Sequence, residues 1–157
     1  MGMRVFNVHD ATFDRDPNPE GFRCGFHKLA PEVGATQLGA TVYDVPPGQS
    51  ICPYHYESRE EWLLVLEGEP TVRRPEGETV LRAGDATAFA AGPDGAHKVT
   101  NAGTGTVRVL LWADADPVGY SAYPDSNKIT HWTDSSNPDD NVRVRRGQNL
   151  DYWDGET

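Results

Sequence analysis

Apolar and polar residues alternate in short runs along most of this chain, and the runs are separated by residues typical of turns. Alternation with a period of two indicates half-buried β-strands, and no long segment repeats apolar residues at helical spacing. Pro75-Glu-Gly77 has the composition of a tight hairpin turn between two such runs. This succession of strands and turns predicts an all-β fold, closed as a barrel or sandwich. The predicted strands of the central region span 36–45, 60–67, 70–74, 78–82, 86–90, 97–101 and 105–113.

The two ends of the chain differ from this central region. Residues 10–34 are rich in Pro, Asp and Gly, with one predicted strand at 22–29. The C-terminal region is polar, yet it contains more aromatic side chains than a disordered segment usually does. We therefore expect it to pack on the barrel, through strands at 128–132 and 142–146 and through Tyr152 and Trp153. The aromatic residues concerned are Tyr120, Tyr123, Trp132, Tyr152 and Trp153.

The chain has 157 residues, enough for one domain with one hydrophobic core. We expect a single domain with a barrel core at about 36–113 and a C-terminal extension at 114–157. Only two cysteines occur, Cys24 and Cys52. Two are too few for a disulfide scaffold, so both are expected to be reduced.

The net charge of the chain limits the classes of partner that we expect it to bind. The formal net charge is −10. A nucleic-acid backbone or an anionic membrane needs a basic face, so neither is expected as a partner. The first residues lack the apolar run of a signal peptide, and no stretch has the length of a membrane span. A cytoplasmic protein that acts on a small molecule is the expectation.

Histidines and glutamates in two segments, 48–68 and 84–101, have spacings that suit strands. Residues of equal parity on a strand face the same side, so Glu61 is expected to point inward and Glu60 outward. Imidazole nitrogens and carboxylate oxygens that converge inside a small barrel make a site for a divalent metal. A cation would also offset the repulsion between two glutamates in a partly dry cavity. The inward set predicted by parity is His55, Glu57, Glu61 and His97.

These residues resemble the two sequence motifs of the cupin superfamily. In the first motif, Gly48, His55, Glu57, Glu61 and Gly68 follow the cupin order, and six residues separate Glu61 from Gly68 as expected. In the second, Gly84, Gly92, Gly95, His97 and Asn101 match in order, with the usual spacing from His to Asn. The resemblance covers 36–113 and implies a double-stranded β-helix, the cupin jelly-roll barrel. It also implies one bound divalent ion, which could be Zn, Mn, Fe or Ni.

The chain departs from the motifs at several positions. Six residues instead of five separate Gly48 from His55, and Ala90 stands where the second motif has Pro. Glu57 replaces the second histidine of the first motif. Three interpretations follow: Glu57 completes a site of two histidines and two glutamates, Glu57 is a free base beside a three-ligand site, or the site is degenerate and empty.

Three functions remain open at this stage. The leading hypothesis is a metal-dependent enzyme of the isomerase, epimerase or lyase type that acts on a small polar metabolite such as a sugar or sugar phosphate, with Glu57 moving protons. The second is an Fe(II)-dependent dioxygenase, because two histidines and a carboxylate suit that metal. The third is a non-enzymatic module that senses a metal or a small molecule.

Two further expectations concern the substrate and the assembly. Arg59 shares the inward parity and is the candidate for binding a phosphorylated or carboxylated substrate. The resemblance to cupins also implies a homodimer, formed by sheet packing or by exchange of an N-terminal strand such as 3–8.

Overall fold

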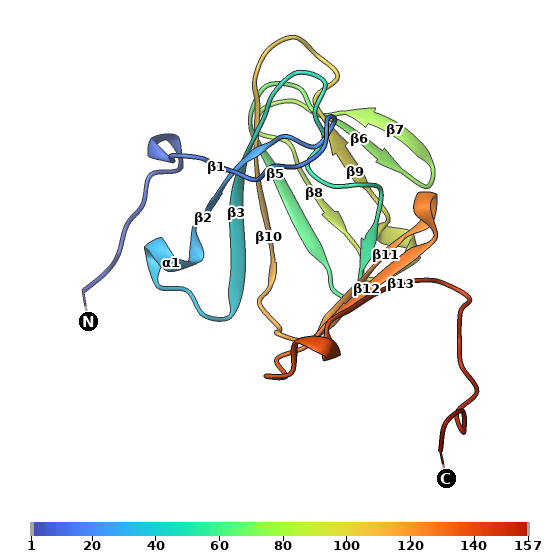
Figure 1. Ribbon diagram of the computed structural model, residues 1–157. Helices are drawn as coiled ribbons and strands as arrows, with labels where there is room; N and C mark the ends of the chain where they lie inside the picture. The colour runs from blue at the N-terminus through green and yellow to red at the C-terminus, as the bar shows by residue number, and fades with distance from the viewer. Residues whose placement is uncertain (1, 157) are drawn as a thin grey trace.

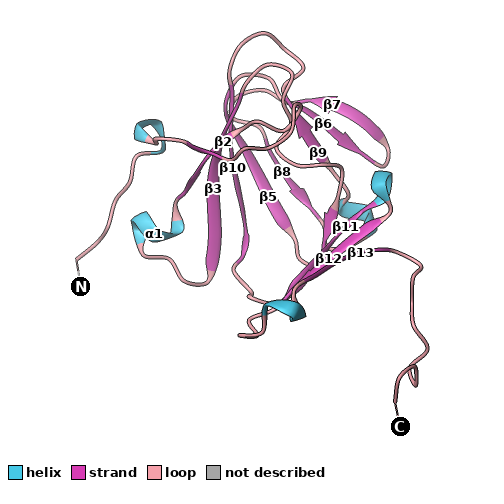
Figure 2. Cartoon of the chain, viewed as in Figure 1, coloured by secondary structure: helices cyan, strands magenta, loops and turns pink. Residues whose placement is uncertain are grey.

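The computed structural model describes residues 2–156, and its regular secondary structure is mainly antiparallel β-sheet (Figures 1 and 2). The helical elements are one short helix, α1 (Ala30–Val33), and four 3-10 turns, η1 (Val8–Asp10), η2 (Pro93–Gly95), η3 (Pro124–Ser126) and η4 (Pro138–Asp140). Within the described residues, no helix is long and apolar enough to cross a membrane.

A six-stranded sheet forms one wall of the barrel, in the order β1-β2-β3-β10-β5-β8. Its long central strands follow the predicted runs closely, because their alternating apolar residues have one face to bury. The members are β1 (Asp14–Arg15), β2 (Gly25–Lys28), β3 (Leu38–Val45), β10 (Val107–Asp114), β5 (Glu61–Glu67) and β8 (Ala86–Phe89).

A three-stranded sheet, β7-β6-β9, forms the second wall, and its strands are β6 (Thr71–Arg74), β7 (Gly77–Val80) and β9 (Lys98–Thr100). The predicted hairpin is confirmed, since β6 and β7 pair antiparallel with Arg74 opposite Gly77. The main core lies between these two sheets and includes Leu63 from β5, Val72 from β6 and Val99 from β9. The fold is therefore the predicted all-β jelly-roll barrel.

The C-terminal extension forms a third sheet with a strand from the first motif, in the order β13-β12-β11-β4. Its strands are β4 (Tyr56–Glu57), β11 (Gly119–Tyr123), β12 (Lys128–Trp132) and β13 (Val142–Arg145). The strands predicted at 128–132 and 142–146 are confirmed, whereas β11 was not predicted. Pairing of β11 with β4 sets Ser121 opposite Glu57 and Ala122 opposite Tyr56. The extension thus contacts the segment that carries two of the candidate site residues.

The last residues do not pack as expected. Tyr152 and Trp153 are 83% and 71% exposed, and they contact each other edge-to-face. Figure 1 shows this segment leading away from the barrel. The prediction that these two aromatic residues dock on the barrel is wrong, because both side chains leave most of their surface to solvent.

The cysteines agree with the prediction, whereas the N-terminal segment leaves one prediction open. Cys24 and Cys52 are free, as predicted. Met3 and Val5 are 90% and 79% exposed, and the segment 3–8 contains no strand within the chain. An exchange of this segment with a second copy stays a prediction.

Candidate metal centre

The two candidate histidines lie opposite each other at a backbone bridge. His55 and His97 pair antiparallel, with N···O distances of 3.1 and 2.8 Å between their backbones. Glu61 begins β5, the neighbour of β8 in the large sheet. Residues from three separate parts of the chain therefore meet at one end of the barrel interior.

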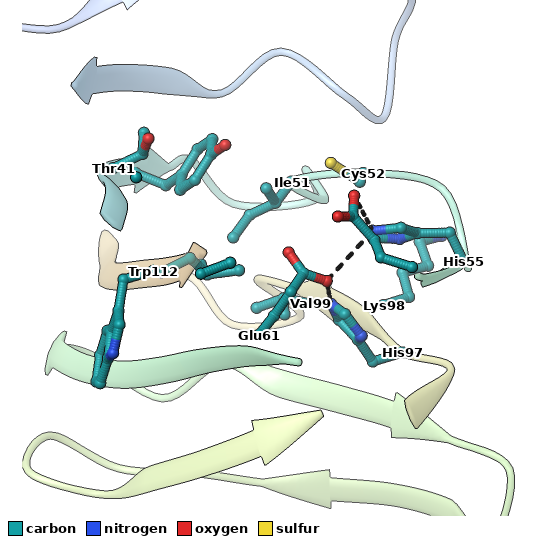
Figure 3. Close-up of a pocket in the computed structure, with 14 residues that line it drawn as sticks. Thr41, Ile51, Cys52, His55, Glu61, His97, Lys98, Val99 and Trp112 are labelled. Atoms are coloured by element: carbon teal, nitrogen blue, oxygen red, sulfur yellow. Dashed lines mark ion pairs between the residues drawn. The ribbon is translucent and has the colours of Figure 1, made fainter. Parts of the chain in front are cut away.

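The ligand atoms of His55, Glu61 and His97 all lie within 4.8 Å of one another. A Glu61 carboxylate oxygen lies 3.6 Å from Nε2 of His97 and 3.9 Å from Nε2 of His55. Figure 3 shows both imidazoles and the Glu61 carboxylate directed at a common point. Ligand atoms around a tetrahedral ion with bonds of about 2.1 Å are separated by roughly 3.4 Å, so the observed spacing is close to that of a metal site.

Backbone carbonyls orient both imidazole rings. Nδ1 of His55 lies 2.9 Å from the Pro53 carbonyl oxygen, and Nδ1 of His97 lies 2.9 Å from that of Gly95. A carbonyl only accepts hydrogen bonds, so each Nδ1 carries the proton and each Nε2 has a free lone pair. The His97 ring also stacks on Phe89, with ring centroids 3.6 Å apart. Both Nε2 atoms are thus fixed toward Glu61 as potential ligands.

The protonation states also suit a cation. Burial lowers the pKa of His97 to about 3, with a further contribution from His55, and burial also lowers the pKa of His55. Burial, reinforced by the charge of Glu57, raises the pKa of Glu61 to about 8. These shifts favour two neutral imidazoles and a protonated Glu61 carboxyl in the metal-free protein, with N···O separations of 3.6–3.9 Å. A divalent ion would replace the Glu61 proton and use the neutral imidazoles as ligands. The donor set fits such an ion.

Glu57 lies beside this group of three rather than within it. One of its carboxylate oxygens is 3.9 Å from Nε2 of His55 and accepts a hydrogen bond from the Ser121 hydroxyl at 3.0 Å. The other is 3.7 Å from Nε of Arg59. These contacts favour a three-residue ligand set with Glu57 as an adjacent, separately held carboxylate.

Arg59 points away from the cavity, toward the connection between β10 and β11. Its guanidinium donates to the carbonyl oxygens of Asp114, Asp116 and Val118, at 2.6, 3.0 and 3.4 Å. It also lies over the Trp132 ring, 5.1 Å from the centroid. Arg59 therefore ties the C-terminal extension to the barrel, and its Nε approaches the candidate metal centre at Glu57. Its predicted role in binding substrate stays a prediction.

A cavity of about 260 Å³ opens beside the ligand group, and most of its lining was not singled out from the sequence. Thr41 and Tyr43 of β3 and Cys52 supply its uncharged polar groups. The sequence contains a signal for Thr41 and Tyr43, because in the predicted strand 36–45 they have the same parity as Val45 and so face the same side. Burial raises the pKa of the Cys52 thiol to about 12, so this cysteine is a neutral thiol and a poor ligand. The apolar part of the lining includes Ile51, Val99, Leu111 and Trp112.

Asn101, the last residue of the second motif, has a structural role and lies outside the ligand group. Its amide nitrogen donates to the carbonyl oxygens of Val45 and Gly105, at 2.8 and 2.7 Å, and its oxygen accepts from the backbone of Gly103. The side chain thus holds the turn that precedes β10.

Comparison with protein families places the central part of the chain in a known group. Residues 41–113 match the family model of the cupin domain. This part of the chain is a cupin domain. It contains His55, Glu57, Glu61 and His97, so the candidate metal centre lies entirely within the cupin region. No curated protein matches the chain.

Solved structures extend the likeness to nearly the whole chain. A protein from Acidithiobacillus ferrooxidans, provisionally named a sugar phosphate isomerase, is similar over 93% of this chain and 94% of its own, with 20% identity and a TM-score of 0.81. A cupin from Silicibacter pomeroyi, named a sugar phosphate isomerase, is similar over 94% of this chain and 97% of its own, with 20% identity and a TM-score of 0.77. The polyketide cyclase RemF from Streptomyces resistomycificus shares 24% identity over 73% of this chain and 81% of its own, with a TM-score of 0.62. At these identities the likeness shows a common fold that includes the C-terminal extension.

Proposed function

We propose that this cupin is a metal-dependent enzyme that moves a proton on a small carbonyl compound, as isomerases, epimerases and lyases do. One observation carries the proposal: Nε2 of His55, Nε2 of His97 and a Glu61 oxygen converge within 4.8 Å, while Glu57 stands beside them with other partners. A free carboxylate next to a metal site has the position required of a general base.

In this proposal His55, Glu61 and His97 hold the ion, which could be Zn, Mn, Fe or Ni. The bound ion would polarise a substrate carbonyl and thereby make the neighbouring C–H more acidic. Glu57 would remove that proton and return it to the adjacent carbon or to the leaving group. Ser121 holds one Glu57 oxygen, and Arg59 lies near the other, so the carboxylate keeps a defined direction. The apolar lining of the cavity would limit the access of water.

The donor set also supports a second candidate, an Fe(II)-dependent dioxygenase. Two histidines and one carboxylate are the ligands that non-heme Fe(II) oxygenases use. The free Glu57 beside them favours proton transfer, and for this reason we place the dioxygenase second. A sensor without catalysis is the third possibility.

The test begins with the metal content of the purified protein and its thermal stability with added Mn, Fe, Ni or Zn. Metal-loaded protein is then incubated in D₂O with small α-hydroxy ketones and aldehydes, and deuterium incorporation beside the carbonyl is followed by NMR. Glu57→Gln should retain the metal and lose the exchange. Glu69→Gln, at an exposed position, is the matched control.

The outcomes separate the candidates. Exchange that persists in Glu57→Gln would remove Glu57 as the base. Oxygen uptake with Fe(II) and no solvent exchange would favour the dioxygenase. A protein with no bound metal and no gain in stability from any of the four ions would exclude both enzymes.

A further inference from the structure

The cavity beside the metal centre has hydroxyl groups and apolar walls, and its lining also contains two glutamates and one lysine, Lys98. Thr41 and Tyr43 present hydroxyls from β3, and Ile51, Val99 and Leu111 present apolar side chains. Figure 3 shows Thr41 on one side of this space and the two histidines on the other. A compound bound at the metal centre would therefore extend toward the hydroxyls of β3.

Glu57 and Glu61 are the acidic residues of the lining. Their two negative charges would balance the charge of one divalent ion, which leaves no excess positive charge for an anionic substrate. A phosphate group carries nearly two negative charges and usually needs arginine, lysine or converging backbone N–H groups. The positions of the cationic side chains near the cavity thus decide whether a phosphate fits.

The cationic side chains near the cavity have other partners. Lys98 belongs to the lining, but its ammonium lies 5.4 Å from the centroid of the Phe22 ring. Arg59 is held by three backbone carbonyls and by the face of Trp132, and its Nε, which has no hydrogen-bond partner among the described residues, lies 3.7 Å from a Glu57 oxygen. Arg74 lies over the Phe89 ring, 5.8 Å from its centroid, and donates to the Ala88 carbonyl.

A second cavity of about 310 Å³ adjoins the first and shares Thr41, Tyr43, Ile51 and Cys52 with it. Lys28 lines this second cavity together with Asp16. One positive and one negative charge in the same lining give no net positive charge for a phosphate. The neighbouring space therefore does not supply the missing cation.

We propose that the substrate of this cavity is a small uncharged hydroxy-carbonyl compound, and not a phosphorylated one, with the hydroxyls of Thr41 and Tyr43 binding its hydroxyl groups. This inference rests on the proposed function, since it assigns the substrate class of the same site. It separates this chain from the sugar phosphates named for its two structural relatives. The volume of about 260 Å³, equal to roughly nine water molecules in the liquid, limits the substrate to a small metabolite.

A matched pair of ligands tests the proposal: dihydroxyacetone and dihydroxyacetone phosphate, which differ only in the phosphate group. Binding to metal-loaded protein is measured by ligand-observed NMR and titration calorimetry, so the readout does not depend on turnover. We expect the neutral ligand to bind at least tenfold more tightly than the phosphate ester. Equal or tighter binding of the phosphate ester, or no binding of the neutral compound, would overturn the proposal.

A variant tests the assigned hydroxyl. Tyr43→Phe keeps the ring and removes one hydrogen-bonding group, so dihydroxyacetone should bind about threefold to tenfold more weakly, with metal content unchanged. Tyr152→Phe, at an exposed position, should bind as the parent protein does. Unchanged affinity in Tyr43→Phe would remove the contact assigned to it and overturn that part of the proposal.

The two proposals fail in different ways. Metal binding with preference for the phosphate ester contradicts only the neutral substrate and leaves the metal-dependent enzyme in place. Absence of metal binding contradicts the proposed function and this inference together. The deuterium exchange measured with Glu57→Gln tests the proposed function alone and does not test the substrate class.

Discussion

The Ser121 hydroxyl donates a hydrogen bond to Glu57 at 3.0 Å, across the pairing of β11 with β4. Ser121 is 5% exposed and belongs to the C-terminal extension, whereas Glu57 belongs to the cupin region. One side chain of the extension thus directs Glu57, the proposed base beside the candidate metal centre. The extension is therefore part of the site and not only a cover for the barrel.

Ser121→Ala should leave the metal in place and slow proton exchange about tenfold. The reason is that Glu57 loses the bond that directs one of its oxygens, and a hydrogen bond to a charged group contributes about 1.5–3 kcal/mol. Metal content and the NMR exchange rate are measured on the same preparation. Ser136→Ala, at an exposed position, is the control. Equal rates in the two variants would show that Glu57 does not depend on Ser121.

The metal-free protein should become less stable as the pH rises from 6.5 to 8. The folded protein keeps the Glu61 proton up to a pKa of about 8, compared with a usual value of 4.5, so unfolding releases a proton in this range. His97, with its pKa lowered from 6.5 to about 3, acts in the opposite direction and offsets this loss below pH 6.5. The expected decrease is up to about 2 kcal/mol, at about 1.4 kcal/mol per pH unit.

Urea unfolding at several pH values measures this dependence. Glu61→Gln should abolish the decrease, and so should a bound divalent ion, which takes the place of the proton. Glu69→Gln should keep the decrease. If the free energy of unfolding of Glu61→Gln decreases above pH 6.5 as steeply as that of the parent protein, another group is responsible.

Asn101→Ala should lower the free energy of unfolding by about 3 kcal/mol. The substitution leaves the buried carbonyl of Val45 and its neighbours without a donor, and each buried unsatisfied group costs about 1–3 kcal/mol. Chemical denaturation measures the loss. The folded fraction should still bind metal, because Asn101 does not touch the ligands. Asn149→Ala, at an exposed position, is expected to cost much less, and similar losses at both positions would argue against this role.

Removal of residues 148–157 should change the midpoint of thermal unfolding by less than about 2 °C. Leu150, Tyr152 and Trp153 are 79%, 83% and 71% exposed, so their removal uncovers little of the core. Differential scanning calorimetry of the full and shortened chains measures the effect. A large decrease would mean that this segment packs on the protein in solution.

Much of the barrel could be predicted because its strands alternate in the pattern that their burial requires. In β5, Leu63 and Val65 point inward and are buried, while Trp62 points to the opposite face and is 42% exposed. The same parity selected Glu61 over Glu60. Glu60 is exposed and accepts a hydrogen bond from the Trp62 indole instead of facing the histidines.

Parity failed for Arg59 because the segment 58–60 lies between β4 and β5 and is not a strand. Side chains alternate between two faces only where the backbone is extended and paired. At this bend the guanidinium turns toward the carbonyls of 114–118. The sequence pattern contains no signal for such a turn.

The sequence by itself determined most strands of the barrel, the two motifs and the four candidate side chains, because local alternation decides which residues a strand buries. The tertiary structure decided which of the four side chains converge. It also decided how Glu57 is held, since its partner Ser121 is 64 positions away along the chain. Contacts between distant segments depend on the pairing of whole strands, which no local pattern contains.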